Sequence, residues 1–157
     1  MPEFRTSTPA DAETIVAMLG PPAREGFVVL PTVERVRERL ADPDLVQRII
    51  EVEGRPVGLL VLGFVADWLA ELRLIVVSEP GRGYGRAGVE YVKRYVFSER
   101  GAHRLYLEVV AHNLRARRLY ESCGFSLEGT WRDGFRAADG SYADLCAYGM
   151  LASEYRG

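Results

Sequence analysis

Hydrophobic and polar positions change their period several times along the chain, and each change marks an expected element. Residues 3–7 alternate and can form a short strand. In residues 8–20 apolar side chains recur every three or four positions, which predicts a helix that Thr8 caps and Gly20 ends. Residues 20–31 are rich in proline and glycine, so we expect a loop there.

The rest of the chain switches between helical and strand periods. Helices are expected in three segments, at residues 32–42, 83–100 and 113–124. Strands are expected in six segments, at residues 45–54, 55–67, 69–77, 103–110, 125–133 and 142–151. The first two of these strands meet at Gly54-Arg55, which is typical of a hairpin.

The strand at 69–77 leads into a crossover. Strict alternation along it predicts two faces, formed by Leu72, Leu74 and Val76 and by Glu71, Arg73, Ile75 and Val77. From residue 70 to residue 110 the order is strand, helix, strand, which predicts a right-handed parallel crossover inside an otherwise antiparallel sheet. No linker interrupts the pattern, so we expect a single α/β domain with a mixed sheet over residues 1–157.

Composition adds the expected setting of this domain. The formal net charge is −2 and acids and bases are interspersed, so nothing favours nucleic acid or a membrane surface as a partner. No apolar run approaches the roughly 18 residues of a membrane span, and the polar N-terminus does not resemble a signal peptide. Cys123 and Cys146 are the only cysteines, which is typical of reduced thiols in a cytoplasmic protein, and no zinc-ligand spacing occurs.

The segment VVSEPGRGYGRAG, residues 76–88, fits two glycine-rich templates that bind different ligands. Residues 83–88 match the G-x-G-x-x-G pattern of NAD-type dinucleotide-binding proteins, and Glu108 lies about 20 residues further on, as that pattern requires. However, residues 78–82 separate the strand from the first glycine, and three expected strands precede the loop. Both features argue against a doubly wound dinucleotide-binding sheet, so this interpretation is the weaker one.

Residues 82–87 also satisfy a second template: glutamine or arginine, any two residues, glycine, any residue, then glycine or alanine. Glycines let the backbone approach a ligand closely, and free N–H groups at a helix start attract a phosphate. Arg82 and Arg86 add positive charge nearby. A tight turn without a ligand is the alternative.

Three segments, in order, resemble the core of the GNAT family, the Gcn5-related N-acetyltransferases. They are ELRLIVVSEPGRGYGRA, HRLYLEVVAHNLRARRLYESCGF and LEGTWRD, and the resemblance covers about residues 70–150. Before residue 70 only the order of elements is similar. The resemblance implies a mostly antiparallel seven-stranded sheet with a central parallel crossover and helices on both faces. It also implies an N-acetyltransferase that moves an acetyl group from acetyl-CoA to a primary amine.

The resemblance implies positions for coenzyme A. The pyrophosphate would bind the glycine-rich loop, and the pantetheine arm would bind backbone groups where the strands at 69–77 and 103–110 splay apart. The expected cofactor-binding residues are Val76, Val77, Arg82, Gly83, Gly85, Arg86, Ala87 and Asn113. For Asn113 a plain helix N-cap is the alternative, and the two roles are compatible.

Tyr120 is the candidate acid. Ala116, Leu119, Tyr120 and Cys123 share one helix face, so Tyr120 points inward. In the family the matching tyrosine protonates or hydrogen-bonds the departing thiolate, and a phenol with a pKa of about 10 can donate to a thiolate whose conjugate acid has a pKa of about 8.5. The alternative is a core tyrosine, and Cys123 is expected to fill the core rather than to react.

Glu71 is the candidate base, because several family members place a catalytic glutamate early in this strand. A carboxylate there could deprotonate an ammonium group through water. The alternatives are a Glu71 that only pairs with Arg73, a base at His112, and no protein base at all.

The acceptor is expected to be a protein N-terminal α-amine or a small amine. EGTWRD and YADLCAYGML are similar to the branch whose enzymes acetylate ribosomal-protein N-termini, which also includes enzymes for small amines and antibiotics. Phe27, Trp68 and Trp131 are candidate lining residues, and no acidic cluster marks a polyamine site. A CoA-binding module without turnover is the alternative function, and a homodimer is plausible for this family.

Overall fold

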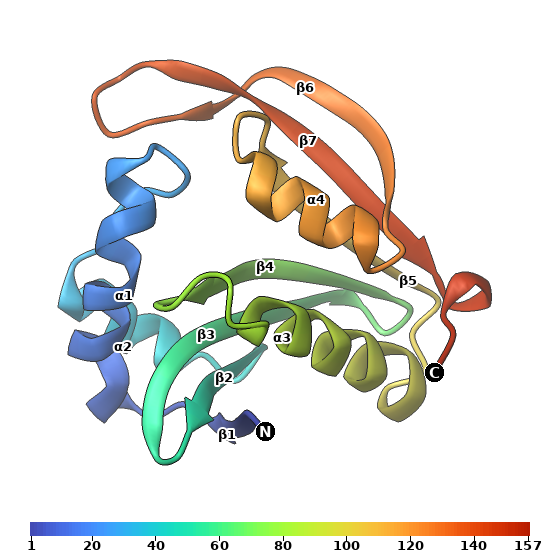
Figure 1. Ribbon diagram of the computed structural model, residues 1–157, viewed down its shortest axis with the longest axis horizontal. Coiled ribbons are helices and arrows are strands. Elements are labelled where there is room, and N and C mark those ends of the chain that lie inside the picture. Colours follow the sequence, from blue (N-terminus) through green and yellow to red (C-terminus); the bar gives the residue numbers. More distant parts are fainter.

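A computed structural model describes residues 1–157 as one seven-stranded sheet with helices on both of its faces (Figure 1). The strands are β1 (Glu3–Thr6), β2 (Leu45–Val52), β3 (Arg55–Ala66), β4 (Leu69–Val77), β5 (Arg104–Val110), β6 (Ser126–Arg136) and β7 (Tyr142–Leu151). The helices are α1 (Ala12–Arg24), α2 (Val33–Leu40), α3 (Tyr84–Lys93) and α4 (Leu114–Ser122). Short 3₁₀ turns occupy Pro9–Asp11 and Ala152–Glu154, and a π-helical stretch, Arg94–Glu99, continues α3.

The strand order is β1-β2-β3-β4-β5-β7-β6, and only β4 and β5 run parallel. α3 provides the crossover between them, so the predicted mixed sheet with one central parallel step is confirmed. The β2–β3 hairpin turns at Glu53 and Gly54, which both have positive φ, one residue earlier than expected.

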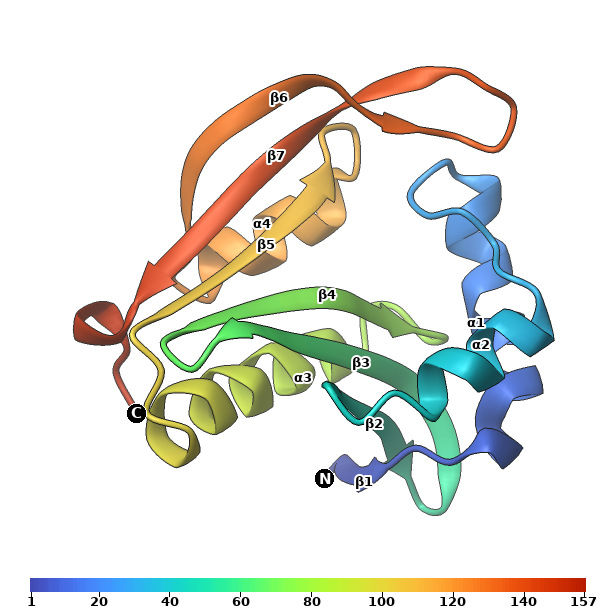
Figure 2. The same cartoon turned by 180° about the vertical axis from the view of Figure 1, so that it is seen from behind.

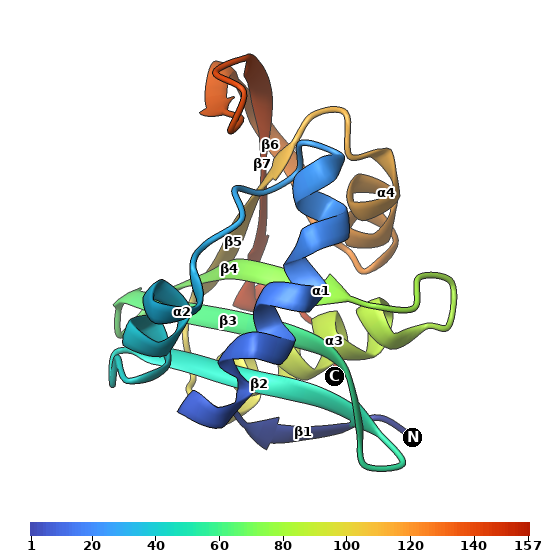
Figure 3. The same ribbon diagram turned by 90° about the vertical axis from the view of Figure 1, so that its left-hand side faces the viewer.

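Helices cover the two faces in pairs, with α1 and α2 on one face and α3 and α4 on the other (Figure 3). The smaller core cluster joins α1 and α2 to β2 and β3, and consists of Ala12, Ile15, Leu19, Val36, Ile49 and Leu59. The larger cluster lies under α3 and α4 and includes the fully buried Leu60, Val92, Leu105 and Tyr148. None of the helices combines the length and the apolar character that a membrane span requires.

α1 is longer than the sequence suggests. It continues past Gly20, which was expected to end it, and contains Pro21 and Pro22. A proline has no N–H for the carbonyl four residues earlier, so the carbonyls of Ala17 and Met18 lose their usual helical partners. The expected loop at 20–31 is therefore helical in its first part, up to Arg24.

A β-bulge breaks the alternation expected within β4. The ladder with β3 shifts register between Leu72 and Leu74, so Arg73 is an extra residue there. Ile75 therefore shares the α3 face with Leu72, whereas Leu74 and Val76 pack toward α1 and α2. The predicted faces of these last three residues were wrong, because strict alternation cannot accommodate an inserted residue.

β4 and β5 pair only near their N-terminal ends. The parallel pairs join Leu69 to Arg104, Ala70 to Leu105 and Glu71 to Tyr106. Beyond them the two strands diverge, as Figures 1 and 2 show, and β5 stays paired with β7. This matches the splay that the family resemblance implied, and it leaves one backbone edge of β4 without a strand partner.

Candidate functional site

The loop between β4 and α3 presents a run of unused backbone donors. No N–H group from Gly81 to Arg86 donates to an acceptor within the protein, whereas the N–H of Ala87 donates to the Gly83 carbonyl at 3.0 Å. Gly81 and Gly83 have φ values of +86° and +83°, in the left-handed region that favours glycine. Consecutive free donors at a helix start are suited to bind an anion such as a diphosphate.

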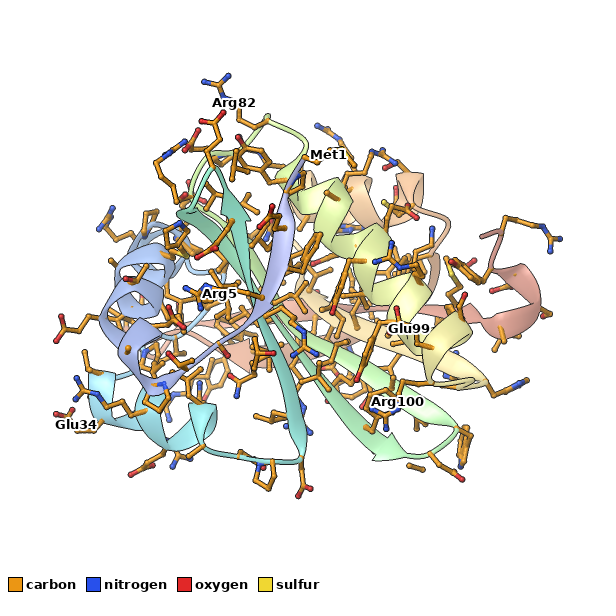
Figure 4. The ribbon with its side chains drawn as sticks, turned by 90° about the horizontal axis from the view of Figure 1, so that it is seen from below. Met1, Arg5, Glu34, Arg82, Glu99 and Arg100 are labelled. Carbon is orange, nitrogen blue, oxygen red and sulfur yellow. The ribbon has the colours of Figure 1, made fainter.

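Arg82 and Arg86 lie differently with respect to these donors. Arg82 projects from the tip of the loop (Figure 4), with its side chain 70% exposed and its Nε 3.8 Å from Glu79. Arg86 turns to α4 and donates to Ser122 Oγ at 2.7 Å. Arg86 therefore ties α3 to α4, a contact that the sequence did not predict.

A cavity of about 300 Å³, called the cofactor cavity below, lies between this loop, α1 and α4. Val76 and Val77 of β4 and Gly85 of α3 line it on one side. Pro21 and Pro22 of α1 line it on another. Mostly apolar walls with free backbone groups suit a long ligand that ends in a phosphate.

Asn113 lines the same cavity and also caps α4. Its Oδ1 accepts a hydrogen bond from the N–H of Ala116 at 3.2 Å, so the N-cap prediction is confirmed. Its amide nitrogen donates to no group within the protein and is available to a ligand.

Tyr120 stands where two cavities meet. Only 7% of the residue is exposed, yet it lines both the cofactor cavity and a second cavity of about 380 Å³. Its hydroxyl makes no hydrogen bond within the protein, and no unpartnered polar side-chain atom is fully buried, so the hydroxyl reaches the open space. Burial, and to a smaller extent nearby Cys123, raises the pKa of Tyr120 above its ordinary value.

The second cavity, called the acceptor cavity below, is enclosed by segments far apart in the sequence. Phe27 and Val28 follow α1, and Phe135 comes from the β6–β7 hairpin, whose tip lies near the end of α1 in Figures 1 and 2. The diverging parts of β4 and β5 form its floor. Because it shares Val76, Asn113 and other walls with the cofactor cavity, ligands in the two cavities would meet beside Tyr120.

Two carboxylates, Glu71 and Glu108, line the acceptor cavity, and only Glu71 was expected there. Glu71 accepts a hydrogen bond from Arg73 Nε at 3.1 Å, the pairing considered as its alternative role. Burial, and then the nearby charge of Glu71, raises the pKa of Glu108 above its ordinary value. The Glu108 carboxylate has no ion pair and is thus a candidate base that sequence reasoning missed. Its signal was a single acid within the apolar strand RLYLEVV.

Three other candidates from the sequence, His112, Trp68 and Trp131, lie outside both cavities. The Nε2 atom of His112 is 3.3 Å from the carbonyl oxygen of Glu25, and its ring lies 5.3 Å from that of Phe27. His112 thus joins the end of α1 to the start of α4. Trp68 and Trp131 are exposed on the surface and line neither cavity, whereas Phe27 lines both.

Residues 14–125 match the model of one protein family, the acetyltransferase (GNAT) family. The matched range includes β4, the donor loop, α3, β5 and α4, which are the elements that build both cavities.

A spermidine N(1)-acetyltransferase of Vibrio cholerae serotype O1 is 34% identical over 87 residues. The aligned part is 55% of this chain and 50% of the relative, so the match spans half of the relative's length. The crystal structure of spermidine N-acetyltransferase from Vibrio cholerae in complex with CoA and spermine superposes with a TM-score of 0.84 at 23% identity, over 98% of this chain and 97% of that one. The crystal structure of spermidine/spermine N-acetyltransferase from the same organism, in complex with manganese ions, superposes with a TM-score of 0.80 at 22% identity. The superposition covers 98% of this chain and 94% of that one. Because the sequence identities are only 22% and 23%, these structural similarities establish the fold alone.

Proposed function

Because the chain belongs to the acetyltransferase (GNAT) family, we propose that it transfers an acetyl group from acetyl-CoA to the primary amine of a small molecule. One observation carries the proposal. The unpaired hydroxyl of Tyr120 lies where a cavity next to free backbone donors meets a cavity that holds two carboxylates.

The residues present fit coenzyme A. The N–H groups from Gly81 to Arg86 would bind the diphosphate, and the free edge of β4 at Val76 and Val77 would bind the amide-bearing pantetheine arm. The amide of Asn113 adds a donor on the opposite side. When bound, acetyl-CoA supplies an acetyl group activated as a thioester.

Two proton transfers remain for the protein. Glu108, directly or through water, accepts the proton that the amine loses as its nitrogen bonds to the acetyl carbon and the carbon–sulfur bond breaks. Tyr120 donates to the departing thiolate. Glu71 remains a second candidate base, but its carboxylate already accepts a hydrogen bond from Arg73 Nε at 3.1 Å.

The names of the relatives favour a small amine over the N-terminal α-amine of a protein, since those enzymes act on spermidine or spermine. An α-amine, with an ordinary pKa near 7.7, would need less help from a base than an aliphatic amine. Both acceptor types therefore belong in the first activity panel, with release of free thiol as the readout.

Two alternatives make different predictions. A CoA-binding module without turnover would bind CoA but release no thiol with any amine. A dinucleotide-binding protein would need a doubly wound parallel sheet, whereas here one strand pair alone is parallel and four strands precede the loop.

The Tyr120→Phe variant tests the proposal directly. We expect kcat to fall by about 10²-fold, because the thiolate leaves without a proton donor, while the affinity for CoA stays unchanged. An assay of free thiol release measures kcat, and calorimetry measures the affinity for CoA. Tyr142→Phe, on an exposed ring outside both cavities, is the matched control. An unchanged kcat in Tyr120→Phe would remove the assigned role of this hydroxyl.

A further inference from the structure

A third hollow of about 460 Å³ lies beneath α2 and adjoins the acceptor cavity. Val28, Val29, Arg73 and Leu74 line both spaces, so they share one wall. A ligand whose amine lies beside Glu108 would reach this hollow by extending along the shared residues, away from Tyr120 and toward α2.

The polar lining of this third hollow, called the arginine hollow below, is mainly basic. Arg35, Arg39 and Arg73 contribute guanidinium groups, against a single carboxylate from Asp42. Arg35 and Arg39 are four positions apart in α2 and so lie on the same side of that helix. Asp42 already accepts a hydrogen bond from the N–H of Asp44 at 2.9 Å.

Arg39 is the cation without a carboxylate partner. Arg35 pairs with Glu38 at 2.9 Å and Arg73 pairs with Glu71 at 3.1 Å, whereas the Arg39 guanidinium forms no ion pair. Its backbone is nevertheless held, because Gln47, only 7% exposed, donates from Nε2 to the Arg39 carbonyl at 2.6 Å. A fixed helix end thus presents free guanidinium donors to the hollow.

Arg73 occupies the junction between the acids and Arg39, and Gly63 of β3 makes room for it. A Cβ atom at Gly63 would lie 2.5 Å from Arg73 Nε and 2.7 Å from Cζ, so the guanidinium packs against the strand only because glycine is there. From the acceptor cavity to the adjoining hollow the lining charges are therefore acidic at Glu108 and Glu71, then basic from Arg73 to Arg39.

From this order we infer that the acceptor is a zwitterion, a primary amine whose far end carries a carboxylate or a phosphate bound by Arg39. This inference rests on the proposed acetyl transfer, whose acceptor it narrows. The ammonium end is attracted by Glu108 before it loses its proton, and the anionic end meets the unpaired guanidinium with Arg35 and Arg73 beside it. A second ammonium group, as in spermidine, would instead meet arginines and be repelled.

A matched acceptor series tests the inference. ω-Amino acids, aminoalkyl phosphates and plain alkylamines of equal chain length, together with spermidine, are compared by thiol release. At one chain length we expect kcat/KM for an anionic acceptor to exceed that of its alkylamine counterpart by about tenfold or more. Whichever of the ω-amino acids and the aminoalkyl phosphates has the higher kcat/KM identifies the anionic group that Arg39 binds.

Arg39→Gln should abolish this preference, so that kcat/KM for an anionic acceptor falls to that of its alkylamine counterpart. Arg37→Gln is the matched control, because Arg37 points to the other side of α2 and stands 3.7 Å from Glu13. The inference is overturned if anionic acceptors are no better than their alkylamine counterparts, if spermidine is the best acceptor, or if Arg39→Gln lowers the rate of every acceptor equally.

Failure of the proposed function would look different, since no amine at all would then release thiol. In that case calorimetric titration of the CoA-saturated protein with the ω-amino acids still tests the arginine hollow. The inference is supported if Arg39→Gln weakens binding of the ω-amino acids about tenfold and Arg37→Gln leaves it unaffected. It is overturned if the unmodified protein and the two variants bind them equally.

Discussion

At the scale of single residues, the site holds a candidate acid, Tyr120, and a candidate base, Glu108, whose pKa values are both raised above their ordinary values. Burial raises the pKa of the Tyr120 phenol, so this hydroxyl stays protonated to a higher pH than that of an ordinary tyrosine. The raised pKa of Glu108 makes this carboxylate a stronger proton acceptor once it is ionised. Both shifts have the same main cause, which is burial of the two groups.

Glu108 should cost the protein some stability at neutral pH. Between the ordinary pKa of a glutamate and the raised pKa of folded Glu108, the folded protein binds more protons than the unfolded chain, so this contribution to stability falls as pH rises. We expect Glu108→Gln to increase the free energy of unfolding at pH 7–8 by less than about 1 kcal/mol, since water screens this open site. Urea denaturation over a pH series measures it.

The gain should vanish below the ordinary pKa of glutamate, where Glu108 is protonated in both states. A variant that is equally stabilised at acidic and neutral pH would contradict this account, because its effect would then come from packing. The same variant should show a reduced rate of acetyl transfer, so stability and activity change in opposite directions.

At the scale of elements, the donor loop depends on backbone conformation more than on side chains. Gly83 has a φ of +83°, and Gly140 in the turn between β6 and β7 has a φ of +85°. Alanine at either position is strained by about 1 kcal/mol, so both variants should lose similar stability. Only Gly83→Ala should also weaken CoA binding, by about tenfold, because it distorts the N–H groups that face the diphosphate.

Calorimetry with CoA and thermal denaturation of both variants measure the two effects separately. Equal CoA affinity in Gly83→Ala and Gly140→Ala would show that the loop conformation does not matter for the ligand. Weakened affinity in both would point instead to a general loss of folded protein.

The elements with a clear period could be predicted from the sequence, and the exceptions have local causes. The spacing around Tyr120 placed it correctly inside α4, and the glycine pattern placed the donor loop at the start of α3. The β4 bulge at Arg73 could not be predicted, because it arises from pairing with β3 rather than from the sequence of β4 itself. Glu108 was missed as a base because its pKa and its proximity to Glu71 depend on how β4 and β5 meet.

At the scale of the whole molecule, residues of α1, β4, α3 and α4 line the cofactor cavity, so one ligand bound there would contact all four elements. A ligand that binds only the folded protein at 100 times its Kd adds about 2.7 kcal/mol of stability. We therefore expect CoA at that concentration to raise Tm by roughly 5–10 °C. Differential scanning fluorimetry measures it, with a nicotinamide dinucleotide as the control ligand.

The nicotinamide dinucleotide should leave Tm unchanged. A shift with that ligand and none with CoA would revive the dinucleotide interpretation of the glycine-rich loop and contradict the proposed function. A homodimer stays a prediction, which analytical ultracentrifugation with and without CoA would test.

The parallel ladder between β4 and β5 is short, so the separation of these two strands must be maintained by other contacts. The sheet is almost divided at this ladder, yet one hydrophobic cluster contains Leu60 and Leu72 from one half together with Leu105 and Tyr148 from the other. α3 and α4 pack on this cluster and therefore fix the distance between the diverging ends of β4 and β5 before a ligand binds. A ligand that binds between these strands then loses little affinity to rearrangement of the backbone.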